Sequence, residues 1–156
     1  MLFSTYNYRF AEEVLNSKLN IKREIEEIIE NLQFRVGEKG NHDIVQLEFH
    51  KKGWHIEPSI ISSQSDKRTK MKLDCLKERV GVEIEFAHHI HVYHEWLKFL
   101  VASEQNLIDV GIHILLDHSF TKKWKPAAPS LQKASKELEM FFKSVISVPI
   151  YIIGIK

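Results

Sequence analysis

Residues 71–86 carry the pattern that most restricts how this chain can fold. Apolar side chains recur at every second position in both halves of the segment. They are Met71, Leu73 and Cys75 in the first half, and Val82, Ile84 and Phe86 in the second. Successive side chains of a β-strand point to opposite faces, so a period of two predicts two strands that each place one face on a core. The segment is therefore expected to form a β-hairpin.

The turn of this hairpin is expected at Glu78 and Arg79. A two-residue turn at this point places Asp74 directly across from Glu83, where Cβ atoms lie about 4.5–5.5 Å apart. Neither turn residue is the Gly or Asn that tight hairpins favour, and Gly81 is a candidate for a bulge that would shift the register.

The polar face of the predicted hairpin carries three carboxylates, those of Asp74, Glu83 and Glu85. Like charges at this spacing repel, and the pKa of one partner rises unless a cation compensates them. Hard divalent cations prefer carboxylate oxygens, so the cluster predicts a Mg²⁺ site on an exposed face. The alternative is a solvated polar face whose counter-charges are three basic side chains: Lys72, Lys77 and Arg79.

The rest of the chain divides into segments of helical and strand periodicity. Helices are expected at 8–17, 20–32, 88–102 and 130–145, with Asn20 and Ser130 as N-caps of the second and the last. Strands are expected at 44–49, 107–116 and 148–155, with a loop at 117–129. This order predicts an α/β sandwich around a central mixed sheet.

The composition agrees with a single domain. The 156 residues are 44% hydrophobic and 28% charged, which suffices for one core. No apolar run reaches the roughly 20 residues that span a membrane, and the first residues lack the segments of a signal peptide. The single cysteine, Cys75, allows no internal disulfide, which fits the cytoplasm.

In its acidic motif and in the order of its elements, the chain resembles the PD-(D/E)XK restriction endonucleases, specifically the BglII/BstYI group related to BamHI. The motif is Asp74, eight intervening residues, and the segment 83–86. The resemblance covers most of the chain. It implies one restriction-endonuclease-like α/β/α sandwich over residues 1–156, with a helical N-terminal part (1–36) and a catalytic core (42–156).

The resemblance also implies roles for the acidic residues. In the family, the equivalents of Asp74 and Glu83 bind the metal together with a main-chain carbonyl, here that of Ile84. The third position is Lys in most members, and Gln or Glu in the BglII and BamHI enzymes. Here it is Glu85, which is expected to orient or deprotonate the attacking water.

The implied activity is that of a type II restriction endonuclease: Mg²⁺-dependent, sequence-specific hydrolysis of phosphodiester bonds in double-stranded DNA. A palindromic site would be cut by a homodimer. Such sites also contain an upstream acidic or amide residue. Glu57 is the candidate for it, and the nearby Ser59 is the alternative.

Two basic clusters are candidates for contacts to the DNA backbone. They are Lys67, Arg68 and Lys70, and Lys122, Lys123 and Lys125. Lysines that contact phosphates position DNA without reading its sequence. A net charge of only +1 argues against indiscriminate nucleic-acid binding, but one basic face with an acidic back is compatible with it. The alternative is that these lysines lie in solvated loops.

A histidine cluster has two interpretations. Its members are His88, His89, His91 and His94. Residues three apart share a helical face, so a transition-metal site is one interpretation. No cysteine or HExxH-type pattern accompanies the cluster, which favours the second interpretation, that of plain helix-surface residues.

Two other functions compete with an endonuclease. One is a catalytically inert or truncated nuclease-fold module that binds DNA or supports assembly; the intact carboxylate set argues against it. The other is a metal-dependent hydrolase of a small phosphorylated substrate; the chain lacks a G-x-x-x-x-G-K-[ST] phosphate loop, which argues against a nucleotide pocket. Duplex binding should weaken steeply with salt, and this distinguishes the two.

Overall fold

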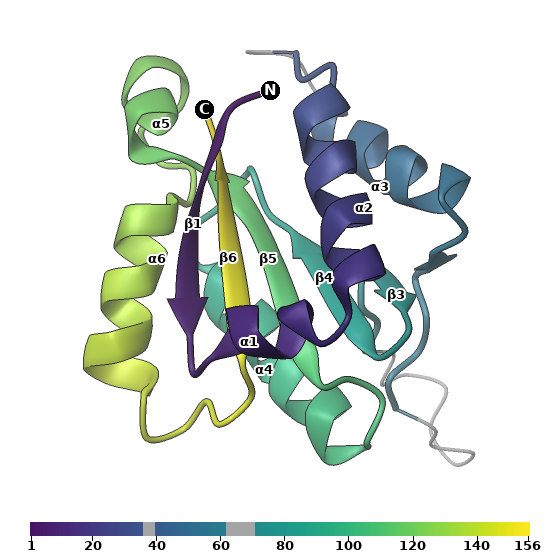
Figure 1. Cartoon of the computed structure of the whole chain (residues 1–156). Helices are drawn as coiled ribbons and strands as arrows, with labels where there is room; N and C mark the ends of the chain where they lie inside the picture. The colour runs from purple at the N-terminus through teal and green to yellow at the C-terminus, as the bar shows by residue number, and fades with distance from the viewer. Residues whose placement is uncertain (36–39, 62–70) are drawn as a thin grey trace.

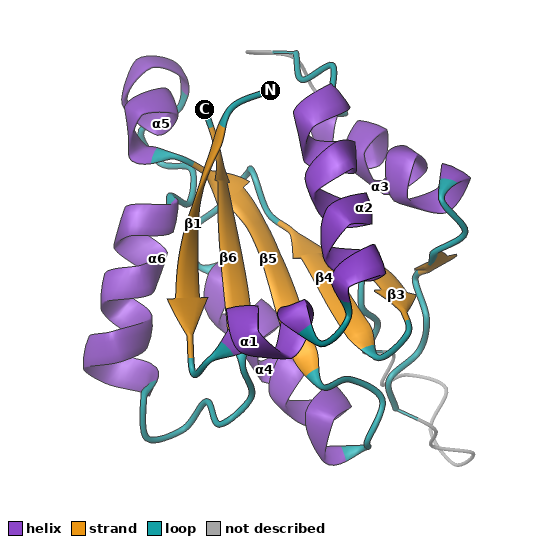
Figure 2. Cartoon of the chain, viewed as in Figure 1, coloured by secondary structure: helices purple, strands orange, loops and turns teal. Residues whose placement is uncertain are grey.

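One mixed sheet organises the described part of the chain, which comprises residues 1–35, 40–61 and 71–156 of a computed structural model. Its six strands stand in the order β1-β6-β5-β4-β3-β2 (Figures 1 and 2). Their bounds are β1 (Phe3–Tyr8), β2 (His55–Ile56), β3 (Cys75–Lys77), β4 (Val80–Ile84), β5 (Val110–Leu116) and β6 (Ile150–Ile155). The central strands β4, β5 and β6 are parallel, and β1, β2 and β3 pair antiparallel with their neighbours.

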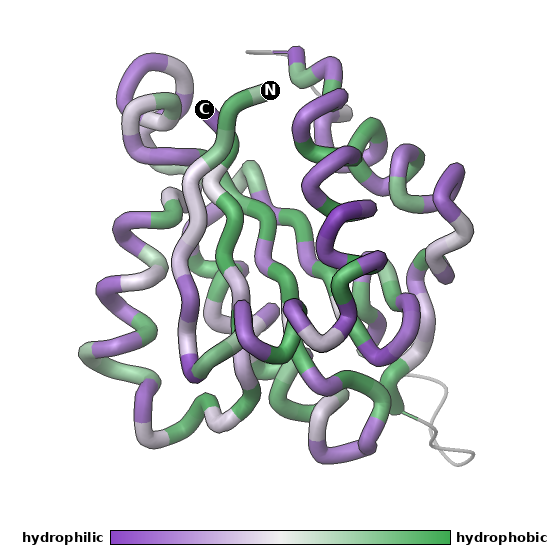
Figure 3. Tube along the Cα trace, viewed as in Figure 1, coloured by the Kyte–Doolittle hydropathy of each residue, from purple (hydrophilic) through white to green (hydrophobic). Residues whose placement is uncertain are grey.

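Helices cover both faces of this sheet. One face carries α1 (Ala11–Asn16), α2 (Leu19–Asn31) and α3 (Asn41–Lys51), and the other carries α4 (His91–Glu104), α6 (Leu131–Glu137) and its π-helical continuation η1 (Leu138–Phe142). The short α5 (His118–Trp124) follows β5. The inner strands are largely hydrophobic, whereas the solvent side of α2 is hydrophilic (Figure 3). This α/β/α sandwich around a mixed sheet confirms the predicted fold class.

The hairpin at residues 71–86 forms with the predicted register. β3 pairs with β4 so that Lys77 lies opposite Val80 and Cys75 opposite Val82. The bulge considered at Gly81 is not formed, because this residue continues the unbroken pairing. An added Cβ at Gly81 would lie 3.0 Å from a Leu73 methyl, so the glycine serves close packing instead.

The predicted turn holds despite its unfavourable residues. Glu78 and Arg79 both adopt positive φ, 46° and 64°, as two-residue hairpin turns require. The Arg79 guanidinium donates to the carboxylate of Asp109 at 2.6 Å and to the side-chain oxygen of Asn106 at 2.9 Å. These bonds anchor the turn to the segment before β5, which offsets the cost of left-handed backbone at non-glycine residues.

Residues 44–49 form the middle of α3, so the strand predicted there is wrong. Val45 and Phe49, which are four residues apart, are fully buried, whereas Leu47 between them is 52% exposed. That spacing is helical, since residues i and i+4 share one face of a helix. The apolar positions of this segment fit both periods, and contact with the core selects the helix.

Two helix starts also differ from the prediction. The expected loop at 117–129 contains α5, whose first turn is capped by the side chain of Asp117. The cap predicted at Asn20 is wrong, because α2 already begins at Leu19. The cap predicted at Ser130 is confirmed, since its hydroxyl accepts a backbone N–H of α6.

Residues 1–36 had been expected to form a helical part, but they also contain the strand β1. β1 pairs antiparallel with β6, with Phe3 opposite Ile155, and completes one edge of the sheet. Its sequence lacks a clear apolar alternation because most of this edge strand is only partly buried.

Close packing brings α4 onto the polar side of the hairpin. An added Cβ at Gly111 in β5 would lie 2.7 Å from the ring of Phe99 in α4, so only glycine allows this approach. Helix α4 thus lies near the face of β4 on which the carboxylates stand. Within the described part of the chain, every helix is too short or too polar to cross a membrane.

Candidate active site

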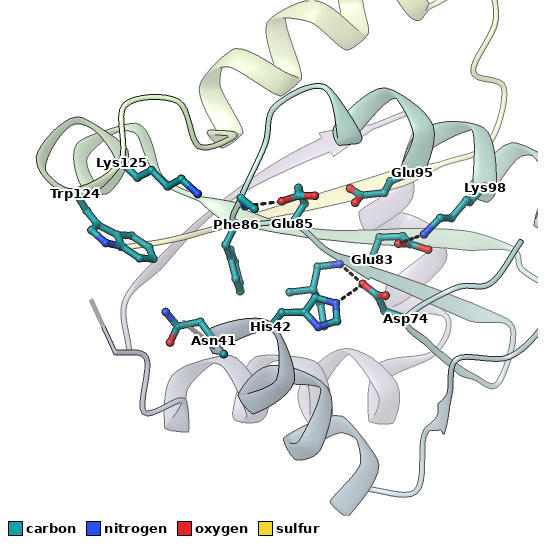
Figure 4. A pocket seen from close by; sticks show the side chains of 13 residues that line it. Asn41, His42, Asp74, Glu83, Glu85, Phe86, Glu95, Lys98, Trp124 and Lys125 are labelled. Carbon is teal, nitrogen blue, oxygen red and sulfur yellow. Dashed lines mark hydrogen bonds and ion pairs between the residues drawn. The ribbon is translucent and has the colours of Figure 1, made fainter. Parts of the chain in front are cut away.

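A cavity of about 450 Å³ lies where β4 ends, between α3 and α4 (Figure 4). It contains four carboxylates, those of Asp74, Glu83, Glu85 and Glu95. The other side chains labelled on its wall are Asn41, His42, Phe86, Lys98, Trp124 and Lys125. The structure therefore brings together the three carboxylates predicted from the hairpin and adds a fourth from α4.

Asp74 stands directly before β3 and ties the two hairpin strands together. Its Oδ2 accepts the backbone N–H of Ile84 at 2.8 Å and lies 3.2 Å from Nε2 of His42. The hydrogen bond to Asp74 raises the pKa of His42 to about 9, so this imidazole is a cation at neutral pH. His42 comes from the first turn of α3, just before the segment 44–49 that was predicted as a strand.

Glu83 is the next-to-last residue of β4 and is fully buried, which corrects the expectation of an exposed carboxylate face. Its Oε2 forms an ion pair with Nζ of Lys98 at 2.7 Å. Its Oε1 is buried and has no hydrogen-bond partner among the described residues. Burial, followed by the charge of Asp74, raises the pKa of Glu83 to about 9, while Lys98 opposes the shift.

Glu85 holds the turn between β4 and α4. Its Oε1 accepts the backbone N–H groups of Ala87 and His88, the second at 3.0 Å. Its Oε2 lies 2.8 Å from Nδ1 of His91. One oxygen is thus fixed by two amides, and the other faces an imidazole that is 54% exposed.

Sequence analysis missed the two residues that α4 contributes, Glu95 and Lys98. The buried stripe of this helix consists mainly of apolar residues, and Glu95 lies within it at 6% exposure. A carboxylate within such a stripe, with a lysine three residues later, is a signal that the sequence could have offered. This pattern places Glu95 and Lys98 in the site only because α4 packs over β4, and the sequence does not specify that packing.

The predicted upstream residue Glu57 lies outside this cavity. Its carboxylate is 58% exposed and forms an ion pair with Lys72 at 2.7 Å. It lines a smaller neighbouring depression, together with Asp74 and Lys98. Its alternative, Ser59, is exposed and donates to the carbonyl of Ile61.

The predicted DNA-contacting lysines are only partly gathered. Lys125 lines the cavity, Lys122 lines a depression beyond α5, and Lys123 is exposed. The other cluster, Lys67, Arg68 and Lys70, lies outside the described residues.

The histidine cluster does not converge. His91 contacts Glu85, and His89 contacts Glu137 at 2.5 Å. The rings of His88 and His91 meet edge-on, with centroids 5.5 Å apart. The separate partners of His89 and His91 argue against a shared metal site. The helix-surface interpretation does not fit His89, which precedes α4 and is only 12% exposed.

The donor set of the cavity fits a hard divalent cation. Oxygen ligands from carboxylates and backbone suit Mg²⁺, and the partnerless Oε1 of buried Glu83 offers one directly. Across residues 1–35, 40–61 and 71–156, no three His, Cys, Asp or Glu side chains already converge on one point. An ion bound here would therefore keep water or backbone oxygens among its ligands, as Mg²⁺ commonly does.

Comparison with known proteins identifies a matching family and a matching fold. The sequence pattern of the family described as restriction endonuclease BglII/BglIII matches residues 3–155. A search of the curated proteins gave no match. Nine chains of solved structures match, among them restriction endonuclease BglII complexed with a DNA 16-mer, with a TM-score of 0.82 and 20% identity over 100% of this chain and 78% of that one. At this identity the structural likeness shows the fold.

Proposed function

The chain belongs to the restriction endonuclease BglII/BglIII family, whose members are type II site-specific deoxyribonucleases, and from this premise we propose that the cavity around Asp74 and Glu83 is the catalytic centre. The proposed reaction is Mg²⁺-dependent hydrolysis of phosphodiester bonds in double-stranded DNA. The observation that carries the proposal is the fully buried carboxylate of Glu83, which lies near Asp74 and has one oxygen without a hydrogen-bond partner in the described part of the chain. A charge in such a place is costly to the fold unless it has a ligand.

Asp74, Glu83 and the main-chain carbonyl of Ile84 are the proposed metal ligands. When bound, Mg²⁺ supplies positive charge that polarises the scissile phosphate and makes nearby water more acidic. Asp74 is already oriented for this task, because Oδ2 is fixed by the backbone N–H of Ile84 and by His42. The two hairpin strands therefore position both carboxylates before any ligand arrives.

Glu85 is the proposed group that orients the attacking water. Two backbone amides fix its Oε1 and so hold the plane of the carboxylate. Its Oε2, which contacts His91, is the oxygen proposed to contact the attacking water. Lys98 compensates the charge of Glu83 at 2.7 Å, and its ammonium is placed to donate to a phosphate oxygen that enters the cavity. Glu57 remains a weaker candidate, since reaching the cavity requires it to leave Lys72.

Duplex DNA is the proposed partner. The solved relative is titled as a complex with a DNA 16-mer, and Lys125 lies at the cavity wall beside Trp124. Lys122, Lys123, and the cluster Lys67, Arg68 and Lys70, are proposed to contact phosphates. A homodimer is proposed because two-fold symmetric sites require two equivalent centres, and the single free cysteine fits action in the cytoplasm.

The test is digestion of unmodified plasmid DNA with the purified chain, in Mg²⁺ and in EDTA, with Asp74→Ala as the comparison. The proposal predicts discrete fragments that require Mg²⁺ and disappear in the variant. Sedimentation of the chain measures its oligomeric state. Smeared products, or fragments retained by Asp74→Ala, would contradict the assignment.

Salt dependence distinguishes a small phosphorylated substrate from a duplex. Binding of duplex DNA through several lysines should fall steeply as salt is raised, whereas binding of a small ester should change little. A chain that binds duplex DNA with a steep salt slope but never cuts it would instead be a DNA-binding module.

A further inference from the structure

The fourth carboxylate of the cavity, Glu95, has no role in the proposed reaction so far. It stands on α4 and is 6% exposed, yet it lines the same cavity as Asp74 and Glu83 (Figure 4). Burial, followed by the charge of Glu85, raises its pKa to about 9. Burying a carboxyl group costs folding free energy unless its oxygens have partners, so the contacts of both oxygens matter.

One oxygen of Glu95 is held by a buried chain of hydrogen bonds. Its Oε2 lies 2.6 Å from Nε2 of His113, and the indole N–H of Trp96 donates to Nδ1 of His113 at 3.1 Å. An indole nitrogen can only donate, so Nδ1 must be the accepting nitrogen and Nε2 must carry the proton. The imidazole therefore donates to Glu95.

This chain of hydrogen bonds is closed off from solvent at its inner end. Trp96 and His113 are both fully buried, and burial lowers the pKa of His113 to about 3, which keeps its ring neutral. In the parallel pairing of β4 with β5, His113 stands beside Glu83. The bonds thus hold Glu95 on the wall of the cavity that Glu83 also lines.

The second oxygen of Glu95 is the informative one. Oε1 makes no hydrogen bond to any described residue, and it belongs to a side chain on the cavity wall. Neutral His113 needs only an acceptor, which an uncharged amide would supply equally well. A carboxylate with one aligned oxygen and one open oxygen is instead the arrangement of a metal ligand supported from behind.

We propose that Glu95 is a further ligand of the divalent cation in this centre, with His113 and Trp96 as its positioning residues. The inference rests on the proposed function of the cavity. Helix α4 then contributes both charges that complete the centre, because Glu95 and Lys98 are one turn apart and Lys98 already pairs with Glu83. The sequence motif on the hairpin describes only half of the site.

Mn²⁺ binding to the DNA-free chain tests this without reference to cleavage. The variants are Glu95→Gln, which preserves shape and an acceptor for His113, and Glu104→Gln, an exposed glutamate of the same helix, as the matched control. Loss of a ligand should weaken Mn²⁺ binding by about tenfold or more, since even residues behind the ligands typically cost 10–100-fold. Glu104→Gln should bind as the wild type does.

A merely structural role gives a different result. In that case Glu95→Gln changes the melting temperature of the metal-free chain while its affinity for Mn²⁺ stays at the wild-type value, and the proposal is overturned. If Glu95→Gln does not fold, Glu95→Asp replaces it, because this variant keeps the charge but withdraws the carboxylate from the cavity.

A wild-type measurement adds a readout that needs no substitution. The indole N–H resonance of Trp96 reports on Glu95 through His113, and the indole of Trp54, which donates to Glu24 on the opposite face, serves as reference. Titration with Mg²⁺ should shift the Trp96 resonance with the midpoint of cation binding. A Trp96 resonance that stays unshifted while the cation binds overturns the proposal.

Glu83→Gln in the same Mn²⁺ assay separates this inference from the proposed function. If Glu83→Gln loses binding and Glu95→Gln does not, the catalytic centre stands and Glu95 is not its ligand. If both variants bind Mn²⁺ as the wild type does, the cavity itself is not the metal centre.

Discussion

Replacement of Glu83 by Gln should make the metal-free protein more stable while it removes a proposed metal ligand. Glu83 is fully buried, and its burial and the nearby charge of Asp74 raise its pKa from 4.5 to about 9. Between these two values the folded state binds a proton that the unfolded state has released. Stability therefore falls as pH rises through this interval. Gln has the same shape and does not titrate, so the variant does not lose stability in this way as the pH rises.

The size of the effect follows from the interval. One proton bound in excess by the folded state costs about 1.4 kcal/mol per pH unit, which amounts to about 4 kcal/mol from pH 5 to pH 8. Glu95 titrates in both proteins and cancels in the comparison. Lys98 loses its partner in the variant but still faces Asp74 and Glu95, so about 4 kcal/mol is an upper bound.

The assay is urea unfolding of wild type and Glu83→Gln at several pH values, in EDTA. The two unfolding free energies should lie close together near pH 5 and diverge toward pH 8, with the variant the more stable. Added Mg²⁺ should raise the stability of the wild type alone, because a ligand stabilises only the state that binds it. A difference that does not change with pH, or a variant less stable at pH 8, would refute the reasoning.

Two further substitutions test the placement of the site and the fold around it. Glu57→Ala should leave cleavage of plasmid DNA close to the wild-type rate, because Glu57 is exposed and paired with Lys72 outside the cavity; a loss as large as that of Asp74→Ala would restore Glu57 to the centre. Gly111→Ala should lower the free energy of unfolding by about 1–3 kcal/mol, because the new methyl would lie 2.7 Å from the ring of Phe99; an unchanged denaturation midpoint would show that α4 does not pack as closely as described.

The hairpin was predictable because its determinants are local. A period of two sets which side chains share a face, and a turn at Glu78 and Arg79 sets the register. The sequence therefore placed Asp74 and Glu83 together correctly. It could not show that Glu83 is buried, because the cover comes from α4, which follows later in the chain.

Other parts of the fold depended on tertiary contacts that no local pattern encodes. The apolar residues of 44–49 fit a strand or a helix, and only the burial of Val45 with Phe49 selects the helix. β1 is an edge strand with weak alternation, and its pairing with β6 joins opposite ends of the chain.

The same reasoning explains why the site was only half predicted. His42, Glu95 and Lys98 reach the cavity from α3 and α4, so each depends on helix packing rather than on spacing along a strand. A helical carboxylate in an apolar stripe, as at Glu95, was the signal available in the sequence.

The most direct test of the account compares Glu83→Gln with the wild type in two assays on the same duplex DNA. We predict that the variant binds the duplex in EDTA as the wild type does but yields no discrete fragments in Mg²⁺. The exposed variant Glu104→Gln should bind and cut normally. Fragments produced by Glu83→Gln at the wild-type rate would contradict the central claim that this buried carboxylate belongs to the catalytic centre.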